Sequence, residues 1–226
     1  MDYISVTYSN DRAPKSSYPR ELIEYLIRRF DINRSGKVLE IGCGRGDFLL
    51  EFHKNGLQAF GIDRESSAIE FSKDLDIRKC DISTEKLPFP ENYFDVIYHK
   101  SLIEHLYDPG NLMKETLRTL KPGGKLIILT PDWWSQMKNF YEDITHCRPY
   151  DESSMQDVLM IYGFKNILTE RFHQLPVLWK YKIVKIVTSF LKLLLNVHIA
   201  RKLTNLTKIK FFRWSVELMV LGYGEK

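Results

Sequence analysis

The fold is decided by Val38-Leu39-Glu40-Ile41-Gly42-Cys43-Gly44-Arg45-Gly46, a short apolar run that ends in three glycines at alternate positions. The run predicts a buried strand, and Asp47-Phe48-Leu49-Leu50-Glu51-Phe52 then begins a helical pattern. Glycines at such a turn let the backbone bend tightly and approach a bound molecule closely, because no Cβ intervenes. A ligand there would lie at the carboxyl end of the strand and the amino end of the helix.

The spacing of the glycines separates two kinds of nucleotide site. A dinucleotide fingerprint, G-x-G-x-x-G, requires glycine at position 47, where this chain has Asp47. A Gly-x-Gly-x-Gly turn preceded by an acidic residue resembles motif I of the class I S-adenosylmethionine-dependent methyltransferases. The resemblance implies that Glu40, Gly42, Gly44 and Gly46 help to bind S-adenosylmethionine.

Strand and helix patterns alternate along the chain. We expect strands over 37–41, 58–63, 77–80, 94–99, 125–130, 164–170 and 216–222, and helices over 17–30, 47–55, 66–75, 109–120 and 151–162. Such alternation predicts a parallel sheet with helices on both faces. The order resembles the methyltransferase fold, which implies an α/β, doubly wound, seven-stranded, mostly parallel sheet whose last strand is antiparallel. We expect a single domain over 1–226 that begins with a helical segment over 1–34.

Two acidic residues follow the second and third predicted strands. Asp63 lies seventeen residues after Gly46, and its two carboxylate oxygens can accept hydrogen bonds from both hydroxyls of a ribose. Asp81-Ile82 resembles the pair that contacts the adenine in the family, with the carboxylate on the exocyclic amine and Ile82 over the ring. The structural alternatives are a solvated surface acid at Asp63 and an ordinary turn at Asp81.

The first candidate base is His105, which forms a Glu-His pair with Glu104 after the fourth strand. The pair resembles one found in methyltransferases of small molecules, quinones and sugars. With an unperturbed pKa of about 6.5, His105 could accept a proton from a hydroxyl, or it could be a structural histidine beneath the cofactor. Some relatives hold a divalent metal here with further carboxylates. Because Ser101 stands three residues before Glu104, that set is incomplete and we expect no metal.

The second candidate base is His146, in a Thr-His-x-Arg segment after the fifth strand. This segment resembles the corresponding part of bacterial methyltransferases of glycans and lipids. His146 could be a base, could orient a substrate hydroxyl, or could simply pack in its loop. Trp133 and Trp134 could likewise stack on a sugar or serve only packing.

The charge of the chain is unevenly distributed. The formal net charge is +4, yet residues 171–216 hold ten lysines and arginines and no acid. This region includes a predicted amphipathic helical insertion over 173–212, before the last strand. Within it the polar residues Lys182, Lys185, Ser189, Lys192 and Asn196 recur at helical spacing and form one stripe.

Three interpretations of the basic insertion stay open. A helix lying in an anionic membrane surface would use residues 179–213. A lid or a homodimer surface would bury the apolar face against protein. Nucleic acid is the least favoured partner, because leucine and isoleucine are abundant in the helix, although the basic residues would suit phosphates.

The location of the protein is predicted from its cysteines and its amino terminus. Three cysteines, odd in number and widely spaced, indicate reduced thiols in the cytoplasm. No signal peptide is visible. The sequence has no charge-free apolar stretch of about 20 residues, so we expect no membrane-spanning helix. Contact of the basic helix with lipid would place the protein at the inner membrane face.

The sequence therefore predicts an S-adenosylmethionine-dependent methyltransferase. The expected reaction is O-methylation of a small or lipid-linked acceptor, such as a glycan, glycolipid or isoprenoid intermediate. Two alternatives belong to other classes: an NAD(P)-dependent oxidoreductase, and a noncatalytic membrane-associated binding module on the same fold.

Overall fold

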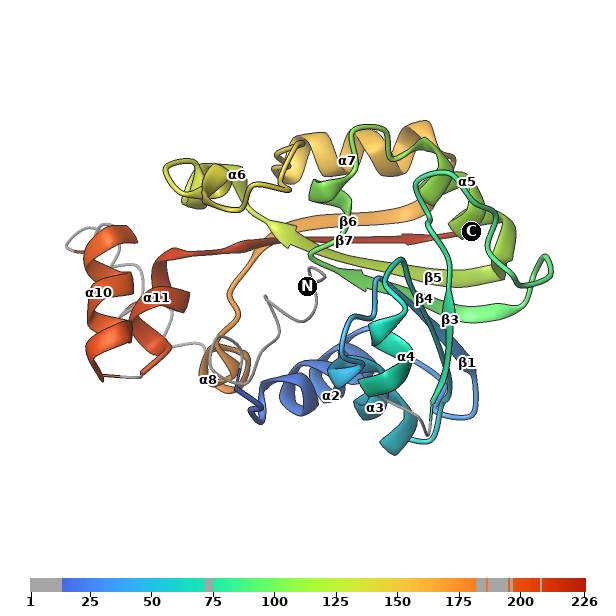
Figure 1. The fold of residues 1–226 in the computed structure, drawn as a ribbon, viewed down its shortest axis with the longest axis horizontal. Helices are drawn as coiled ribbons and strands as arrows, with labels where there is room; N and C mark the ends of the chain where they lie inside the picture. Colours follow the sequence, from blue (N-terminus) through green and yellow to red (C-terminus); the bar gives the residue numbers. More distant parts are fainter. Residues whose placement is uncertain (1–13, 72–74, 182–185, 187–194, 196, 208) are drawn as a thin grey trace.

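The computed structural model describes residues 14–71, 75–181, 186, 195, 197–207 and 209–226 (Figure 1). These residues form a seven-stranded sheet of order β3-β2-β1-β4-β5-β7-β6, in which β7 runs antiparallel to both of its neighbours. The strands are β1 (Lys37–Ile41), β2 (Gln58–Asp63), β3 (Asp76–Lys79), β4 (Phe94–Lys100), β5 (Leu120–Pro131), β6 (Lys165–Phe172) and β7 (Met219–Glu225). The predicted α/β fold with a reversed last strand is confirmed.

Helices cover both faces of the sheet (Figure 1), as the alternating pattern predicted. One layer contains α2 (Tyr18–Arg29) and α3 (Asp47–Lys54), and the other contains α5 (Gly110–Thr119) and α7 (Glu152–Ile161). Successive strand residues face opposite layers. Leu39 accordingly belongs to the core beneath α5 and α7, whereas Val38 belongs to the core beneath α2 and α3. The short helix α4 (Ser67–Phe71) follows β2.

The glycine turn, residues 42–46, needs glycine for conformational reasons. Gly42, Gly44 and Gly46 have φ angles of 70°, 51° and 76°, in the left-handed region that side chains with a Cβ disfavour. A Cβ on Gly42 would also lie 3.0 Å from Leu102 Cδ1. The turn therefore places β1, the start of α3 and the segment after β4 close together, and Gly46 forms the amino-terminal cap of α3.

The last strand begins three residues later than predicted, at Met219 instead of Val216. The apolar run starting at Val216 is shared between the end of α11 (Phe211–Val216) and the strand, so hydrophobicity alone did not locate the boundary. Gly222 lies inside β7 rather than at its end. A Cβ there would be 2.8 Å from Met155 Cγ, so this glycine allows α7 to approach the sheet closely.

The fifth strand begins at Leu120, five residues before the predicted start. Leu120 pairs with Phe94 and Lys125 pairs with Val96, so residues 121–124 bulge out opposite a single residue of β4. Residues 121–124, which lie between the predicted helix and the predicted strand, form a bulge within the bounds of β5, with Gly123 at φ 72°.

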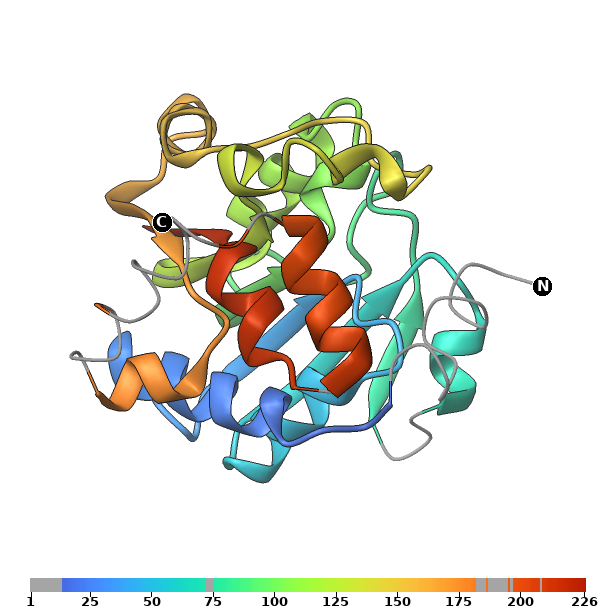
Figure 2. The ribbon, with the colours of Figure 1, turned by 90° about the vertical axis from the view of Figure 1, so that its left-hand side faces the viewer.

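Between β6 and β7, the described residues contain α8 (Pro176–Lys180), α10 (Val197–Thr207) and α11. The predicted stripe of Lys182, Lys185, Ser189, Lys192 and Asn196 lies outside the described residues. Helices α10 and α11 lie side by side (Figure 2), and α11 leads into β7. No helix in the described part of the chain combines the length and apolar character that a membrane crossing requires.

Candidate active site

A cavity of about 470 Å³ lies at the carboxyl ends of β1, β2 and β4. Its volume is in the range typical of small-molecule pockets. The lining includes six of the residues predicted to bind cofactor or to catalyse: Gly42, Gly44, Asp63, Asp81, Ile82 and His105. Thr145 lines the same cavity. Glu40, Gly46 and His146 are not among the lining residues.

Asp63 connects β2 to the glycine turn at the cavity wall. Its Oδ2 accepts a hydrogen bond from the Gly44 backbone N–H at 2.8 Å, and its Oδ1 accepts one from the Glu65 N–H at 3.0 Å. Burial raises the pKa of Asp63, and these two hydrogen bonds oppose that rise. Each carboxylate oxygen retains further acceptor capacity, so the geometry fits the predicted contact with a ribose.

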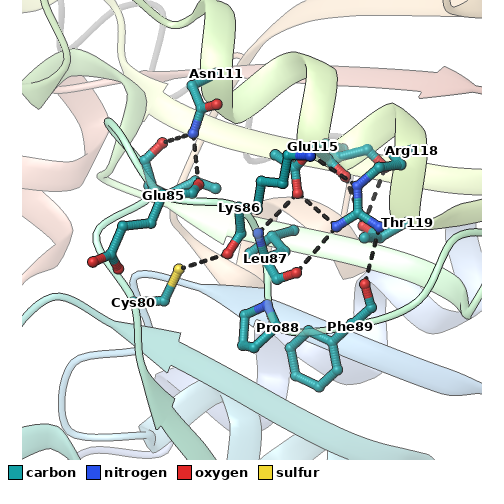
Figure 3. A network of polar contacts seen from close by, with 12 residues as sticks. Cys80, Glu85, Lys86, Leu87, Pro88, Phe89, Asn111, Glu115, Arg118 and Thr119 are labelled. Atoms are coloured by element: carbon teal, nitrogen blue, oxygen red, sulfur yellow. Dashed lines mark hydrogen bonds and ion pairs between the residues drawn. The ribbon is translucent and has the colours of Figure 1, made fainter.

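Asp81 and Ile82 begin a loop that the α5 side holds in place (Figure 3). Asn111 Nδ2 donates to the carbonyl oxygens of Ile82 and Glu85, each at 2.8 Å. Arg118 pairs with Glu115 and donates to the carbonyl oxygens of residues 87 and 89. Asn111, Glu115 and Arg118 lie about thirty residues from the loop in the sequence, and no sequence motif predicted their contacts with it.

Asp81 also organises its own turn. Its Oδ1 accepts hydrogen bonds from the backbone and hydroxyl of Ser83, at 3.0 and 2.6 Å. One carboxylate oxygen of Asp81 therefore stabilises an ordinary turn, as the structural alternative proposed. Asp81 nevertheless lines the cavity beside the buried Ile82.

Glu40 is in β1, but it does not line the cavity. It is 2% exposed, and burial raises its pKa well above the usual value, an effect that a hydrogen bond from the Leu49 backbone opposes. Its predicted contact with the cofactor stays a prediction.

The two candidate bases are brought together although forty residues separate them. His105 ends the 3₁₀ turn η1 (Ile103–His105), and His146 follows η2 (Phe140–Glu142). The Glu104 carbonyl oxygen accepts hydrogen bonds from the backbone N–H groups of Cys147 and Arg148, at 2.9 and 3.1 Å. These bonds place the imidazole rings 4.8 Å apart between centroids, at an interplanar angle of 65°.

Hydrogen bonds from the 140–145 segment define the tautomer of each neutral histidine. His146 Nδ1 lies 2.7 Å from the Phe140 carbonyl oxygen, which can only accept, so Nδ1 carries the proton. The Thr145 hydroxyl donates to Asp143 Oδ1 at 2.6 Å and therefore accepts from His105 Nδ1 at 2.8 Å. In both neutral rings Nε2 is the hydrogen-bond acceptor. Burial, and then the neighbouring His146, lower the pKa of His105, which favours its neutral form.

Glu104 completes a Glu–His–His cluster with His105 and His146. Its side chain is fully buried, and burial raises its pKa to about 7. Oε2 accepts a hydrogen bond from Thr130 Oγ1 at 2.8 Å, whereas Oε1 has no hydrogen-bond partner among the described residues. One carboxylate oxygen and one ring nitrogen of each histidine all lie within 4.8 Å of one another.

The Glu–His–His cluster offers its ligand atoms to a cation. We expected no metal from the sequence because position 101 is a serine and not a carboxylate. The third possible ligand is instead His146, from a loop distant in the sequence. These three residues are the ones among the described residues that could hold a metal ion.

The two tryptophans after β5 do not line the cavity. Trp133 contacts Phe140 and Tyr141 edge-on, in agreement with the packing interpretation. Trp134 is 59% exposed, and its indole N–H donates to Asp151 Oδ2 at 3.0 Å.

The sheet order, the reversed last strand and the cavity above the glycine turn define the fold of the class I S-adenosylmethionine-dependent methyltransferases. Residues 15–169 match the family model described as a methyltransferase domain. This match covers more than half of the chain, and the chain therefore belongs to the methyltransferase domain family.

Three similar proteins illustrate this membership. Phosphoethanolamine N-methyltransferase 3 of Arabidopsis thaliana is 29% identical over 167 residues, which cover 66% of this chain and 33% of the relative. A ubiquinone/menaquinone biosynthesis C-methyltransferase of Burkholderia mallei is 29% identical over 130 residues, which cover 52% and 53%. The crystal structure of a SAM dependent methyltransferase from Archaeoglobus fulgidus superimposes with a TM-score of 0.66 at 23% identity, over 100% of both chains. This chain thus spans about a third of the plant relative and about half of the bacterial one.

Proposed function

We propose that this protein transfers a methyl group from S-adenosylmethionine to an oxygen or nitrogen nucleophile of a small or lipid-linked acceptor. The observation that carries the proposal is the single cavity that joins the glycine turn, Asp63 and Asp81 to His105. Family membership supports the same reaction class and sets the nicotinamide-dependent alternative aside.

The residues present fit the cofactor. Gly42 and Gly44 permit close approach of its amino-acid half, Asp63 would accept hydrogen bonds from the ribose hydroxyls, and Asp81 with Ile82 would contact the adenine. When bound, S-adenosylmethionine supplies an electrophilic methyl group on a positively charged sulfur. The chain's own contribution is to orient the acceptor in line with that methyl group and to remove a proton.

His105 and His146 are the proposed proton acceptors. Each neutral ring accepts at Nε2, because its Nδ1 proton is held by the 140–145 segment. The sequence resemblance favours a hydroxyl on a glycan, glycolipid or isoprenoid intermediate as the acceptor. The named activities of relatives include N- and C-methylation, so a nitrogen nucleophile is the second candidate acceptor.

The described end of the basic insertion supports the lid interpretation. Arg201 of α10 pairs with Glu142 of η2 and with Glu217, and Arg213 pairs with Glu217 at 2.6 Å. These contacts attach α10 and α11 to the loop region that carries His146. Membrane and dimer contacts through the remainder of 179–213 stay predictions, testable by vesicle sedimentation and sizing.

The function is tested by cofactor binding and methyl transfer. Calorimetry should detect binding of S-adenosylmethionine and none of NADH. Radiolabel from the methyl group should enter a compound of a cell extract. Joint replacement of His105 and His146 by alanine should abolish transfer and preserve cofactor binding. Failure to bind S-adenosylmethionine would contradict the proposal, and binding without transfer would favour the noncatalytic binding module.

A further inference from the structure

We propose that the surface around the opening of the cofactor cavity docks this protein on a lipid bilayer that contains anionic lipids. The docking surface consists of the exposed side chains of residues 134–148 and of the basic side of α10. This inference gives the protein a partner, and it does not depend on the methyl transfer proposed above.

The first argument is the row of exposed apolar side chains in residues 134–144. Trp134, Met137, Tyr141 and Ile144 are all exposed, and Ile144 is the most exposed of them at 96%. Phe140, which lies among them in the sequence, is buried against the rest of the protein. The segment therefore presents an apolar side outward, and transfer of these side chains from water into lipid is favourable.

The second argument is the position of this row beside the cavity. Thr145, the neighbour of Ile144 in the sequence, lines the cavity. Tyr107 lines it as well and is 85% exposed. A residue that lines a cavity and is largely exposed lies at its opening. A bilayer that covered the apolar row would therefore lie next to the entrance of the site.

The third argument is the positive charge that accompanies the apolar row. Lys138 and Arg148 are exposed within the same segment. Lys202 is exposed on α10, and residues 171–216 contain no acid at all. Exposed apolar side chains combined with lysine and arginine are the features by which peripheral proteins bind anionic membranes.

The two acids of the segment are engaged by protein groups. Glu142 pairs with Arg201 of α10. Asp143 Oδ1 accepts hydrogen bonds from the backbone and hydroxyl of Thr145. The ion pair also places α10 beside the apolar row, and in Figure 2 the segment, in yellow, lies directly above the two red helices α10 and α11. The basic and apolar parts therefore belong to one face of the molecule.

The form of the surface favours a bilayer over a protein partner. Ile144 protrudes from its loop, and Tyr107 protrudes from a second loop. Side chains that protrude singly can enter a fluid lipid layer, whereas a protein interface requires a densely packed and complementary core. Tryptophan and tyrosine, which the surface contributes at positions 134, 141 and 107, are also enriched where membranes meet water.

Vesicle sedimentation tests the charge requirement. The chain, without cofactor or acceptor, is mixed with vesicles of phosphatidylcholine alone or with an equal amount of phosphatidylglycerol. We expect binding to the mixed vesicles that is roughly tenfold or more above binding to the neutral ones, and that weakens as NaCl rises from about 0.1 M to about 1 M. Absent binding to the mixed vesicles, or equal binding to both kinds, would overturn the proposal.

A pair of double variants tests the apolar row. Met137→Ser with Ile144→Ser should weaken binding to the mixed vesicles roughly tenfold or more, because two apolar side chains no longer enter the lipid. Met160→Ser with Ile161→Ser is the matched control and should bind like the parent. Met160 and Ile161 are also exposed, but they end α7 just before β6 begins, at the opposite end of the sheet from the cavity. Parental binding by the first variant would exclude the apolar row as the contact.

A second pair separates local from overall charge. Lys138→Gln with Lys202→Gln should weaken binding to the mixed vesicles roughly tenfold. Lys114→Gln with Lys165→Gln removes the same net charge from exposed positions in α5 and β6 and should have a much smaller effect. Equal losses in the two variants would show that net charge, and not this surface, causes the binding.

Fluorescence reports insertion directly. Of the four tryptophans, Trp134 is the exposed one, and Trp179 is partly buried. Brominated phosphatidylcholine in the mixed vesicles should quench the fluorescence of the parent. Trp134→Phe should remove most of this quenching, and Trp179→Phe should retain it. Quenching that persists in Trp134→Phe would contradict the proposed orientation.

A second copy of the chain is the competing occupant of the surface. A dimer in light scattering that Met137→Ser with Ile144→Ser separates, together with absent vesicle binding, would overturn the proposal in favour of a dimer interface. Vesicle binding by a protein that does not bind S-adenosylmethionine would refute the proposed function and leave this inference intact.

Discussion

The carboxylate of Asp63 accepts a hydrogen bond from the backbone N–H of Gly44, with 2.8 Å between Oδ2 and the nitrogen. One side chain thus connects the carboxyl end of β2 to the glycine turn after β1. Because Glu65 N–H donates to the other oxygen, the carboxylate is oriented from both sides at the cavity wall.

Replacement of Asp63 by alanine should weaken S-adenosylmethionine binding by about 1.5–3 kcal/mol, the value of hydrogen bonds to a charged group. The change removes the proposed ribose contact and leaves the Gly44 N–H without its carboxylate. Calorimetry measures the effect. Asp76→Ala, on the exposed start of β3, is the control and should bind like the parent. Unaltered affinity in Asp63→Ala would refute the ribose role.

Thr145→Val should lower kcat roughly tenfold or more with little change in cofactor affinity, because outer-shell hydrogen bonds orient functional histidines. The hydroxyl connects Asp143 to His105 Nδ1, and valine removes that connection while preserving shape. The Thr145→Ser variant, which keeps the hydroxyl, should have a kcat close to that of the parent. Ring ¹⁵N spectra should show His105 losing its single tautomer.

The control for Thr145 is Thr207→Val, since the Thr207 hydroxyl donates to Leu203 within α10. A Thr145→Val enzyme with parental kcat and an unchanged tautomer would show that the threonine does not position His105.

His99 should make the fold sensitive to acid. Burial lowers its pKa to about 3, while the unfolded chain titrates near the ordinary value of about 6.5. Between these values only the unfolded chain binds the proton, so stability falls as the pH drops below about 6.5. The slope attributable to His99 is up to about 1.4 kcal/mol per pH unit.

His99→Leu should remove this slope and leave stability at pH 7 unchanged or higher, because neither ring nitrogen has a hydrogen-bond partner among the described residues. Urea unfolding at pH 7 and pH 5 measures it. His53→Leu, at an exposed position of α3, should retain the parental slope. The same slope in His99→Leu would exclude His99 as its source.

Glu217→Ala should destabilise the protein by about 1.5–3 kcal/mol. Glu217 is only 3% exposed and pairs with Arg201 and Arg213, so its removal leaves two guanidinium groups without their shared carboxylate. Limited proteolysis should cut α10 and α11 sooner. Glu51→Ala, which breaks a single pair with the exposed Lys54, should cost less than about 1 kcal/mol. Equal losses in the two variants would contradict this account.

The cofactor half of the site was predictable because its signals are local. The glycine turn needs left-handed backbone at three positions, and Asp63 ends a strand whose bounds were predicted correctly. Each of these features depends on neighbours within a few residues. The identity of the fold and the placement of Asp63 followed from them.

The other half of the site depends on contacts between distant segments. The Thr145 hydroxyl contacts His105 across 40 residues of sequence, and Arg118 contacts the loop that begins at Asp81 across 31 residues. A sequence motif contains no information about which ring nitrogen a distant loop will engage. The cluster of Glu104 with both histidines could therefore be found only once the chain was folded.

The pairing of Phe172 with Met219 has a consequence for how this protein can vary. The 46 residues between these partners connect the end of β6 to the start of β7. Because Phe172 and Met219 are directly paired, the two strands are placed relative to each other as in a hairpin. Their length can change without moving any strand, since lengthening a loop adds little entropic cost, provided that the buried residues of the segment, such as Leu178 and Glu217, keep their contacts. Evolution, or an engineer, can thus alter what approaches the histidines while the nucleoside pocket stays intact.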